Sequence, residues 1–263
     1  MENSSIASKH HYYVLFFKSP DFSMGKILKS LGVKKREIIN FDTKFSKNSY
    51  FQLPINRLLG SRKLLDNKYH NLGEGFYKYD FYLGSFKSNR REVFYLCYPY
   101  KQIDIYLRKN YKKLFDNMTL FKPNVEVILN YFVNPSIHKQ SRIEKEGLET
   151  DITKYTAHVH EGNTKNVSLT GENPLNSLVY KILSKEKDIV LKPVSMKLKC
   201  IDLDLGYIEI LFDINGNYRF WISKNKQEER ISMLPRIFEF FNEIDALYDS
   251  QSISDISKLE DDA

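Results

Sequence analysis

Three short runs between residues 195 and 223 constrain the fold more than any other part of the chain. Each is a strand-like stretch of apolar residues interleaved with polar ones. The runs are SMKLKCIDLDL (195–205), GYIEILFD (206–213) and YRFWIS (218–223). The turn residues NGN join the last two. Ser232 can then cap a helix that tolerates Pro235 in its first turn. We therefore expect a three-stranded meander whose core face is covered by a helix.

Strand-like and helical segments are also mixed in the first half of the chain. Residues 11–18 have the composition of a buried strand, and 76–86 and 91–100 that of a hairpin joined by the polar turn KSNR. Ser23 is a candidate cap for a short helix that stops at Gly32. Further segments are a helix at 102–116 and a strand at 124–133. The sequence thus predicts an α+β fold with mixed or antiparallel sheets rather than a parallel doubly wound sheet.

A polar stretch, NPSIHKQSRIEKEGLETDIT at 134–153, predicts the connection between two domains. The first domain is expected at 1–133 and is basic and rich in aromatic residues. The second, at 154–248, contains the meander and its helix. Residues 249–263 are polar and acidic, which predicts a flexible tail.

The second domain is expected to begin with a hairpin, in which residues 154–161 pair with 165–170. A helix should follow, with Asn173 as its cap and Pro174 in its first turn. The stripe expected to be buried comprises Leu175, Leu178, Val179 and Ile182.

The charge is distributed unevenly along the chain. The whole chain carries a formal net charge of +7, but residues 26–113 hold 20 Lys and Arg against 7 Asp and Glu, whereas residues 239–263 hold 8 acidic residues and a single lysine. A strongly basic region suggests a polyanionic partner, most often a nucleic acid. The alternative is a lysine-rich coat that only keeps the protein in solution.

Aromatic and basic residues are interleaved between residues 68 and 101, which contain 11 Phe and Tyr. Binders of single-stranded nucleic acid combine cations with aromatic faces on which bases stack. The competing interpretation is that these aromatic side chains form the core, because Tyr77, Tyr79 and Phe81 share one face of a strand. The candidate nucleic-acid-binding residues are Lys78, Lys87, Arg90, Arg91, Lys101, Arg108, Lys109, Lys112 and Lys113.

The segment KYTAHVHEG contains the pattern most suggestive of a metal site. His158 and His160 share one face of a predicted strand, roughly 6.5–7 Å apart, where two imidazoles can converge on one Zn²⁺ or Mn²⁺. Such a site needs further ligands, and Glu161 is a candidate only if the chain turns there. The favoured interpretation is two ordinary histidines on the open face of a hairpin, because a pattern of two residues has little specificity.

Carboxylates at Asp202 and Asp204 are the other candidate metal ligands, since paired carboxylates hold Mg²⁺ in many nucleases. A restriction-endonuclease pattern would require a lysine where Leu211 stands. The simpler interpretation is a half-exposed sheet in which these two aspartates point outward and Ile201, Leu203 and Leu205 point inward.

The absence of certain motifs makes several functional classes improbable. The sequence has no GxxxxGK[ST], no GxGxxG after a strand, no GxSxG, no HExxH and no CxxC, which argues against a P-loop, dinucleotide chemistry and α/β-hydrolase catalysis. We expect no cofactor. Cys97 and Cys200 lie apart in apolar segments, which favours a reducing, cytoplasmic location over a disulfide scaffold. Apolar runs are too short to span a bilayer, so no membrane partner is expected.

Taken together, these features favour a basic cytoplasmic binding protein that contacts nucleic acid or an acidic protein partner. Such a protein would belong to a larger assembly, with a protein partner or a second copy of the chain, and a host–phage defence system is one setting that fits by association. The first alternative is a metal-dependent nuclease or phosphodiesterase that uses His158, His160, Glu161, Asp202 and Asp204. The second is a structural interaction subunit.

Overall fold

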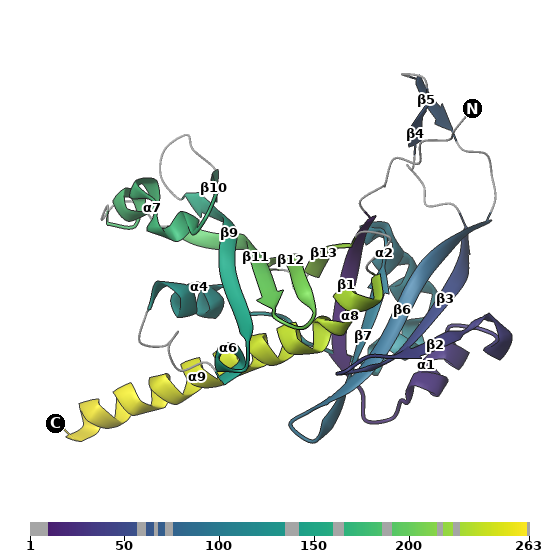
Figure 1. Ribbon diagram of the computed structural model, residues 1–263, viewed down its shortest axis with the longest axis horizontal. Helices are drawn as coiled ribbons and strands as arrows, with labels where there is room; N and C mark the ends of the chain where they lie inside the picture. The colour runs from purple at the N-terminus through teal and green to yellow at the C-terminus, as the bar shows by residue number, and fades with distance from the viewer. Residues whose placement is uncertain are drawn as a thin grey trace. The chain divides into compact units, whose positions relative to one another are not determined.

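A computed structural model describes the backbone of residues 10–56, 62–65, 68–71, 76–134, 142–159, 166–185, 191–214, 218–222 and 227–261 (Figure 1). The chain divides into two compact units, which we call the N-terminal unit (residues 10–120) and the C-terminal unit (residues 121–263). Both contain antiparallel strands and helices, which confirms the predicted α+β class.

The N-terminal unit is built on an antiparallel sheet with the strand order β1-β7-β6-β3-β2, and β8 pairs with β1. Its strands are β1 (His10–Lys18), β2 (Ile39–Asp42), β3 (Lys47–Asn56), β6 (Phe76–Ser88), β7 (Arg91–Tyr98) and β8 (Thr119–Leu120). The predicted hairpin is confirmed as β6 and β7, whose turn places Asn89 and Arg90 at positive φ. A separate hairpin pairs β4 (Arg62–Leu65) with β5 (Lys68–Asn71).

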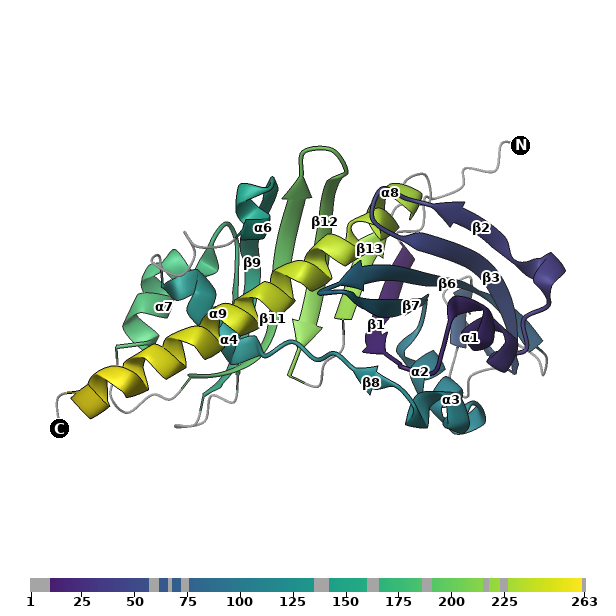
Figure 2. The same ribbon diagram turned by 90° about the horizontal axis from the view of Figure 1, so that it is seen from below.

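Three helices cover one face of this sheet, which we call the helix face. They are α1 (Met24–Ser30), α2 (Lys101–Asn110) and α3 (Lys112–Asp116), and Figure 2 shows α1 beside β3 and β6. Ser23 caps α1 as predicted, because its side chain accepts a hydrogen bond from the Lys26 amide. The predicted helix at 102–116 is interrupted at Tyr111, where the backbone leaves helical geometry. Apolar side chains from the helices and from alternate strand positions, such as Leu53 and Phe81, form one core cluster.

The opposite face of the sheet is also filled with large side chains. Tyr12, Tyr82 and Tyr95 are buried there, and the Tyr12 and Tyr82 rings meet edge to face. The Tyr95 side chain crosses Gly84 on the neighbouring strand, and its hydroxyl donates a hydrogen bond to the Asn48 side-chain oxygen. Most of the aromatic side chains that the structure describes between residues 79 and 98 therefore serve as core.

The C-terminal unit contains a sheet with the order β10-β9-β11-β12-β13, in which neighbouring strands are antiparallel. Its strands are β9 (Leu148–Val159), β10 (Asn166–Thr170), β11 (Leu191–Asp202), β12 (Gly206–Asp213) and β13 (Tyr218–Ile222). Its helices are α4 (Val125–Val133), α6 (Arg142–Lys145), α7 (Leu178–Leu183), α8 (Gln227–Ser232) and α9 (Leu234–Asp261). Helix α9 lies across β11 and β12 (Figure 2). Its Phe241 packs against Phe212 and Tyr218, with ring centroids 5.1 and 5.9 Å apart. None of the described helices has the length and apolar character needed to cross a membrane.

The predicted strand at 124–133 is wrong, because these residues form α4. The Asn124 side chain accepts hydrogen bonds from the Glu126 and Val127 amides and so caps the helix. Val125, Ile128 and Tyr131 are buried at helical spacing. A short apolar run does not distinguish a buried strand from a buried helix, and here the cap decides between them.

The prediction that an apolar stripe of the helix after Asn173 is buried is also wrong. Residues 174–176 form a short 3₁₀ turn, and α7 starts afresh with Ser177 as its cap. Leu175 in the turn is buried, but Leu178, Val179 and Ile182 are 72%, 52% and 50% exposed. The new helix start therefore separates Leu175 from the residues with which it was expected to share a face.

Residues 135–141 of the predicted connection at 134–153 lie outside the described residues. The two units meet in sequence between Leu120 and Phe121, and the described part of the stretch, residues 142–153, contributes α6 and the first half of β9. Residues 249–261, expected as a flexible tail, continue the backbone of α9.

Both cysteines are buried free thiols. Burial raises the pKa of the Cys97 thiol well above its usual range and raises the pKa of Cys200 to about 12. The reactive thiolate is therefore scarce at pH 8 as well as shielded. We expect a thiol reagent to label neither cysteine of the native protein during the time in which both react in denaturant. Rapid labelling of either native thiol would contradict the burial described.

Candidate nucleic-acid interface

The link between α1 and β2 is strongly basic and lies beside two surface hollows. We call residues 33–39 (VKKREII) the basic segment; it follows Gly32, whose positive φ ends α1, and contains a 3₁₀ turn at Lys35–Glu37. The Glu37 carboxylate accepts a hydrogen bond from the Lys34 backbone amide and so holds the turn. Lys34, Lys35 and Arg36 are all exposed. Hollows open on both sides of this segment.

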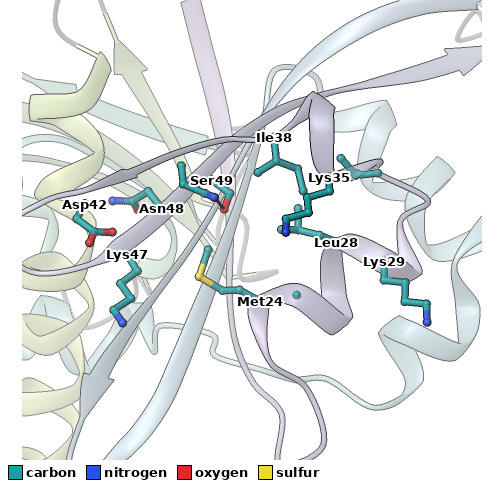
Figure 3. A pocket seen from close by; sticks show the side chains of 12 residues that line it. Met24, Leu28, Lys29, Lys35, Ile38, Asp42, Lys47, Asn48 and Ser49 are labelled. Atoms are coloured by element: carbon teal, nitrogen blue, oxygen red, sulfur yellow. Dashed lines mark hydrogen bonds between the residues drawn. The ribbon is translucent and has the colours of Figure 1, made fainter.

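The first hollow, which we call the α1 hollow, lies on the helix face between α1 and the β2–β3 hairpin and has a volume of about 590 Å³ (Figure 3). Its apolar lining comprises Met24, Leu28, Val33 and Ile38. Lys29, Lys35 and Lys47 contribute positive charge, and Asp42 is the acidic residue in the lining. The Ser49 hydroxyl donates to the Asn40 side-chain oxygen at 2.7 Å, so the two polar strand residues hold each other in place.

The second hollow, which we call the β3-edge hollow, has a volume of about 520 Å³. It exists because β2 is short: β2 pairs with β3 only from Lys47 to Tyr50, and no strand among the described residues pairs with β3 beyond Tyr50 on that side. Lys34, Arg36 and Lys78 line it together with Glu37. Its wall is formed by Tyr50, Gln52, Leu53 and Pro54, and Val33 lines both hollows.

The Tyr50 ring in the β3-edge hollow is held by three neighbours. Its hydroxyl donates to the Asp80 carboxylate at 2.6 Å, and the Gln52 amide donates to the same carboxylate at 2.9 Å and to the Tyr50 oxygen at 3.2 Å. The Tyr82 ring packs against it with a centroid distance of 5.2 Å. Burial, together with the hydrogen bond to Asp80 and its negative charge, raises the pKa of Tyr50 to about 12. The ring is therefore a neutral, fixed surface at ordinary pH.

The nine candidate cations predicted from the sequence fall into three places. Lys87, Arg90 and Arg91 lie at the β6–β7 turn, near the level of Lys47, which pairs with Ser85. Lys78 pairs with Pro54 and lies nine residues back along β6, roughly 30 Å away. The remaining five are on the helices and line neither hollow: Lys101, Arg108, Lys109, Lys112 and Lys113. Of the nine, Lys78 lines one of these two hollows and the other eight line neither.

One of these nine cations, Arg108, forms an ion pair within the fold. The Arg108 guanidinium contacts the Asp104 carboxylate at 2.9 Å and lies 5.5 Å from the Phe115 ring centroid, so its charge is partly used within the fold. The other eight are exposed, and none forms an ion pair with an acidic group in the part of the chain that the structure describes.

Five cations that line the hollows were not singled out from the sequence: Lys29, Lys34, Lys35, Arg36 and Lys47. The available signal was local charge density, because residues 26–36 contain five Lys and Arg and no acidic residue. That count indicates a basic segment, but the hollows depend on the length of β2, which the count does not reveal.

The histidine and carboxylate candidates are far apart within the C-terminal unit. His158 is exposed near the end of β9, opposite Asn166 and Lys192, whereas Asp202 pairs with Leu148 at the other end of the same strand. Ten residues along a strand separate the two levels by roughly 30 Å. His160 and Glu161 lie outside the described residues. No cluster of three or more potential metal ligands occurs among the residues whose positions are described.

Asp202 has a structural role that differs from the prediction. Its side chain was expected to point outward and Leu203 inward, but Asp202 is 6% and Leu203 81% exposed. Strand β11 ends at Asp202, and its carboxylate accepts hydrogen bonds from the Asp204 and Leu205 amides of the turn. The carboxylate also lies 3.5 Å from Nε of the buried Arg236. These contacts satisfy Asp202 within the fold and turn it away from any exposed metal site.

Comparison of the chain with family models, with curated proteins and with solved structures gives no match. Function is therefore inferred from the residues and their geometry.

Proposed function

We propose that this protein binds nucleic acid, and that its N-terminal unit contacts the phosphate backbone through the cations around the basic segment. One observation carries the proposal: six exposed cations line two adjacent hollows in which Glu37 and Asp42 are the acidic residues. The six are Lys29, Lys34, Lys35, Arg36, Lys47 and Lys78.

A polyanion accounts for this arrangement better than a single small anion does. The cations are spread over two hollows on either side of the basic segment, so one phosphate group cannot contact all of them. A nucleic acid presents a phosphate at every nucleotide and releases counterions at each contact, which makes such a dispersed set of lysines effective. Lys87, Arg90 and Arg91 at the β6–β7 turn extend the same positive surface at the Lys47 end of the sheet. The buried free thiols suit a reducing compartment, and we place the protein in the cytoplasm.

Removing equal charge from two places tests this proposal. One triple variant replaces Lys34, Lys35 and Arg36 by Gln, and its matched control replaces Lys109, Lys112 and Lys113 on the helices by Gln. Fluorescence anisotropy with a labelled single-stranded oligonucleotide gives the affinity of each variant between 50 and 200 mM salt. We expect the first variant to bind more weakly and to lower the slope of log affinity against log salt by about 2, because three phosphate contacts are lost.

The control variant should lose much less affinity, since its cations line neither hollow. Equal losses in both variants would mean that the overall charge, and not the basic segment, attracts the oligonucleotide. That result would contradict the proposed placement.

A further inference from the structure

The geometry of the β3-edge hollow points to a more specific ligand, and this inference rests on the proposed nucleic-acid binding. We propose that the hollow takes one unstacked base of a single-stranded nucleic acid, with the Tyr50 ring as the stacking surface and Lys34, Arg36 and Lys78 as contacts to the flanking phosphates.

Tyr50 has the properties of a stacking surface. Tyr50 lines a hollow of about 520 Å³, within the range of small-ligand sites, and the hydroxyl of its ring is anchored to Asp80 and Gln52. An anchored ring loses little conformational freedom when a base stacks on it, so binding is preorganised. Stacking on aromatic rings is a main source of affinity for single strands and tolerates every base.

The polar groups beside the ring fit the rest of a nucleotide. Both hydrogen-bonding directions of the Gln52 amide nitrogen are used, toward Tyr50 and Asp80, which leaves its carbonyl oxygen to accept from the amino group of a base. Lys34, Arg36 and Lys78 supply three positive charges at the same hollow, and Glu37 is already engaged by the Lys34 amide. A base face with flanking phosphates matches this combination of ring, acceptor and cations.

Two other ligands fit less well. A duplex keeps its bases stacked and paired, so presenting a base face to Tyr50 would cost the free energy of unstacking and unpairing that base. An acidic peptide could add as a strand to the open edge of β3, but Pro54 has no amide hydrogen and interrupts the ladder that such a peptide needs.

A Tyr50→Leu substitution tests the base site. Labelled oligo-dT and a labelled duplex of equal length are titrated against wild type, Tyr50→Leu and the control Tyr106→Leu, which removes another half-buried tyrosine of the N-terminal unit that lines neither hollow. We expect Tyr50→Leu to weaken single-strand binding about 10-fold, with the salt slope and the duplex affinity unchanged, because stacking and not charge is lost. Tyr106→Leu should bind as wild type does.

A second measurement uses the unaltered protein and so does not depend on the folding of a variant. Irradiation of its complex with an oligonucleotide containing 5-iodouracil should attach the base to Tyr50, and mass spectrometry should find the adduct in the peptide 48–57.

The outcomes separate the two proposals. Oligonucleotide binding that keeps its salt slope but is unaffected by Tyr50→Leu, with the adduct elsewhere, would overturn the base site and leave the basic surface standing. Binding of duplex as tight as that of single strand, or binding of poly-glutamate in place of oligo-dT, would also overturn it. Absence of any oligonucleotide binding by wild type would overturn both.

Discussion

Replacing Gly84 by Ala is expected to destabilise the protein by roughly 3 to 5 kcal/mol, which is a large fraction of the roughly 5 to 15 kcal/mol by which domains are stable. A Cβ at this position would lie 2.1 Å from the Cζ atom of the Tyr95 ring, far inside van der Waals contact. The ring cannot move aside freely, because its buried hydroxyl is hydrogen-bonded to Asn48 and lies 3.1 Å from the Ser46 hydroxyl. Displacing it would add the cost of unsatisfied buried polar groups to the overlap.

Urea unfolding of the Gly84→Ala protein measures this effect, and Gly25→Ala is the matched control. Gly25 lies in α1 with nothing within 4 Å of its missing Cβ, so Ala should be neutral or stabilise the protein by up to about 1 kcal/mol. In a Tyr95→Ala background, Gly84→Ala should cost little, since the atoms it meets are gone. A Gly84→Ala protein within about 0.5 kcal/mol of wild type would contradict the packing described.

Replacing Arg236 by Leu is the second large expected effect, about 3 to 5 kcal/mol of lost stability. The guanidinium is buried, contacts the Glu146 carboxylate and the Glu146 backbone oxygen at 3.1 Å each, and lies 3.5 Å from the Asp202 carboxylate. Removing it leaves the buried Asp202 without its cation, and an uncompensated buried charge is far more costly than the loss of an exposed pair.

Arg142→Leu provides the comparison, because Arg142 pairs with the same Glu146 at 3.3 Å but is exposed. It should cost at most about 1 kcal/mol in the same unfolding experiment. A double variant, Arg236→Leu with Asp202→Asn, should lose less stability than the sum of its two single changes. If Arg236→Leu and Arg142→Leu lowered the free energy of unfolding equally, the contact between Arg236 and Asp202 would contribute nothing to stability.

Local signals in the sequence were sufficient for several elements of the fold. The KSNR turn predicted the β6–β7 hairpin, and Ser23 with Gly32 marked the ends of α1 to within a residue. These elements depend on neighbours in the chain, so their cause is visible in the sequence. Segment 124–133 was misassigned because its apolar run suits a strand or a helix, and the exposed face of α7 was missed because the helix starts at Ser177.

From the sequence, the candidate site could be predicted only as a concentration of positive charge. Lysine density indicated a basic N-terminal half, but the β3-edge hollow results from the early end of β2, and the Tyr50 ring is fixed by Asp80, which lies thirty residues later. Likewise, the sequence predicts an exposed strand position for Asp202, because its partner, Arg236, comes from a helix far along the chain. Such long-range pairings leave no periodic trace in the sequence.

The salt dependence of oligonucleotide binding by the full wild-type chain tests the central proposal most directly. With six phosphate contacts at the two hollows, affinity for a single strand should fall by roughly two to three orders of magnitude between 50 and 200 mM salt. No binding at 50 mM salt, or an affinity that does not change with salt, would contradict the account.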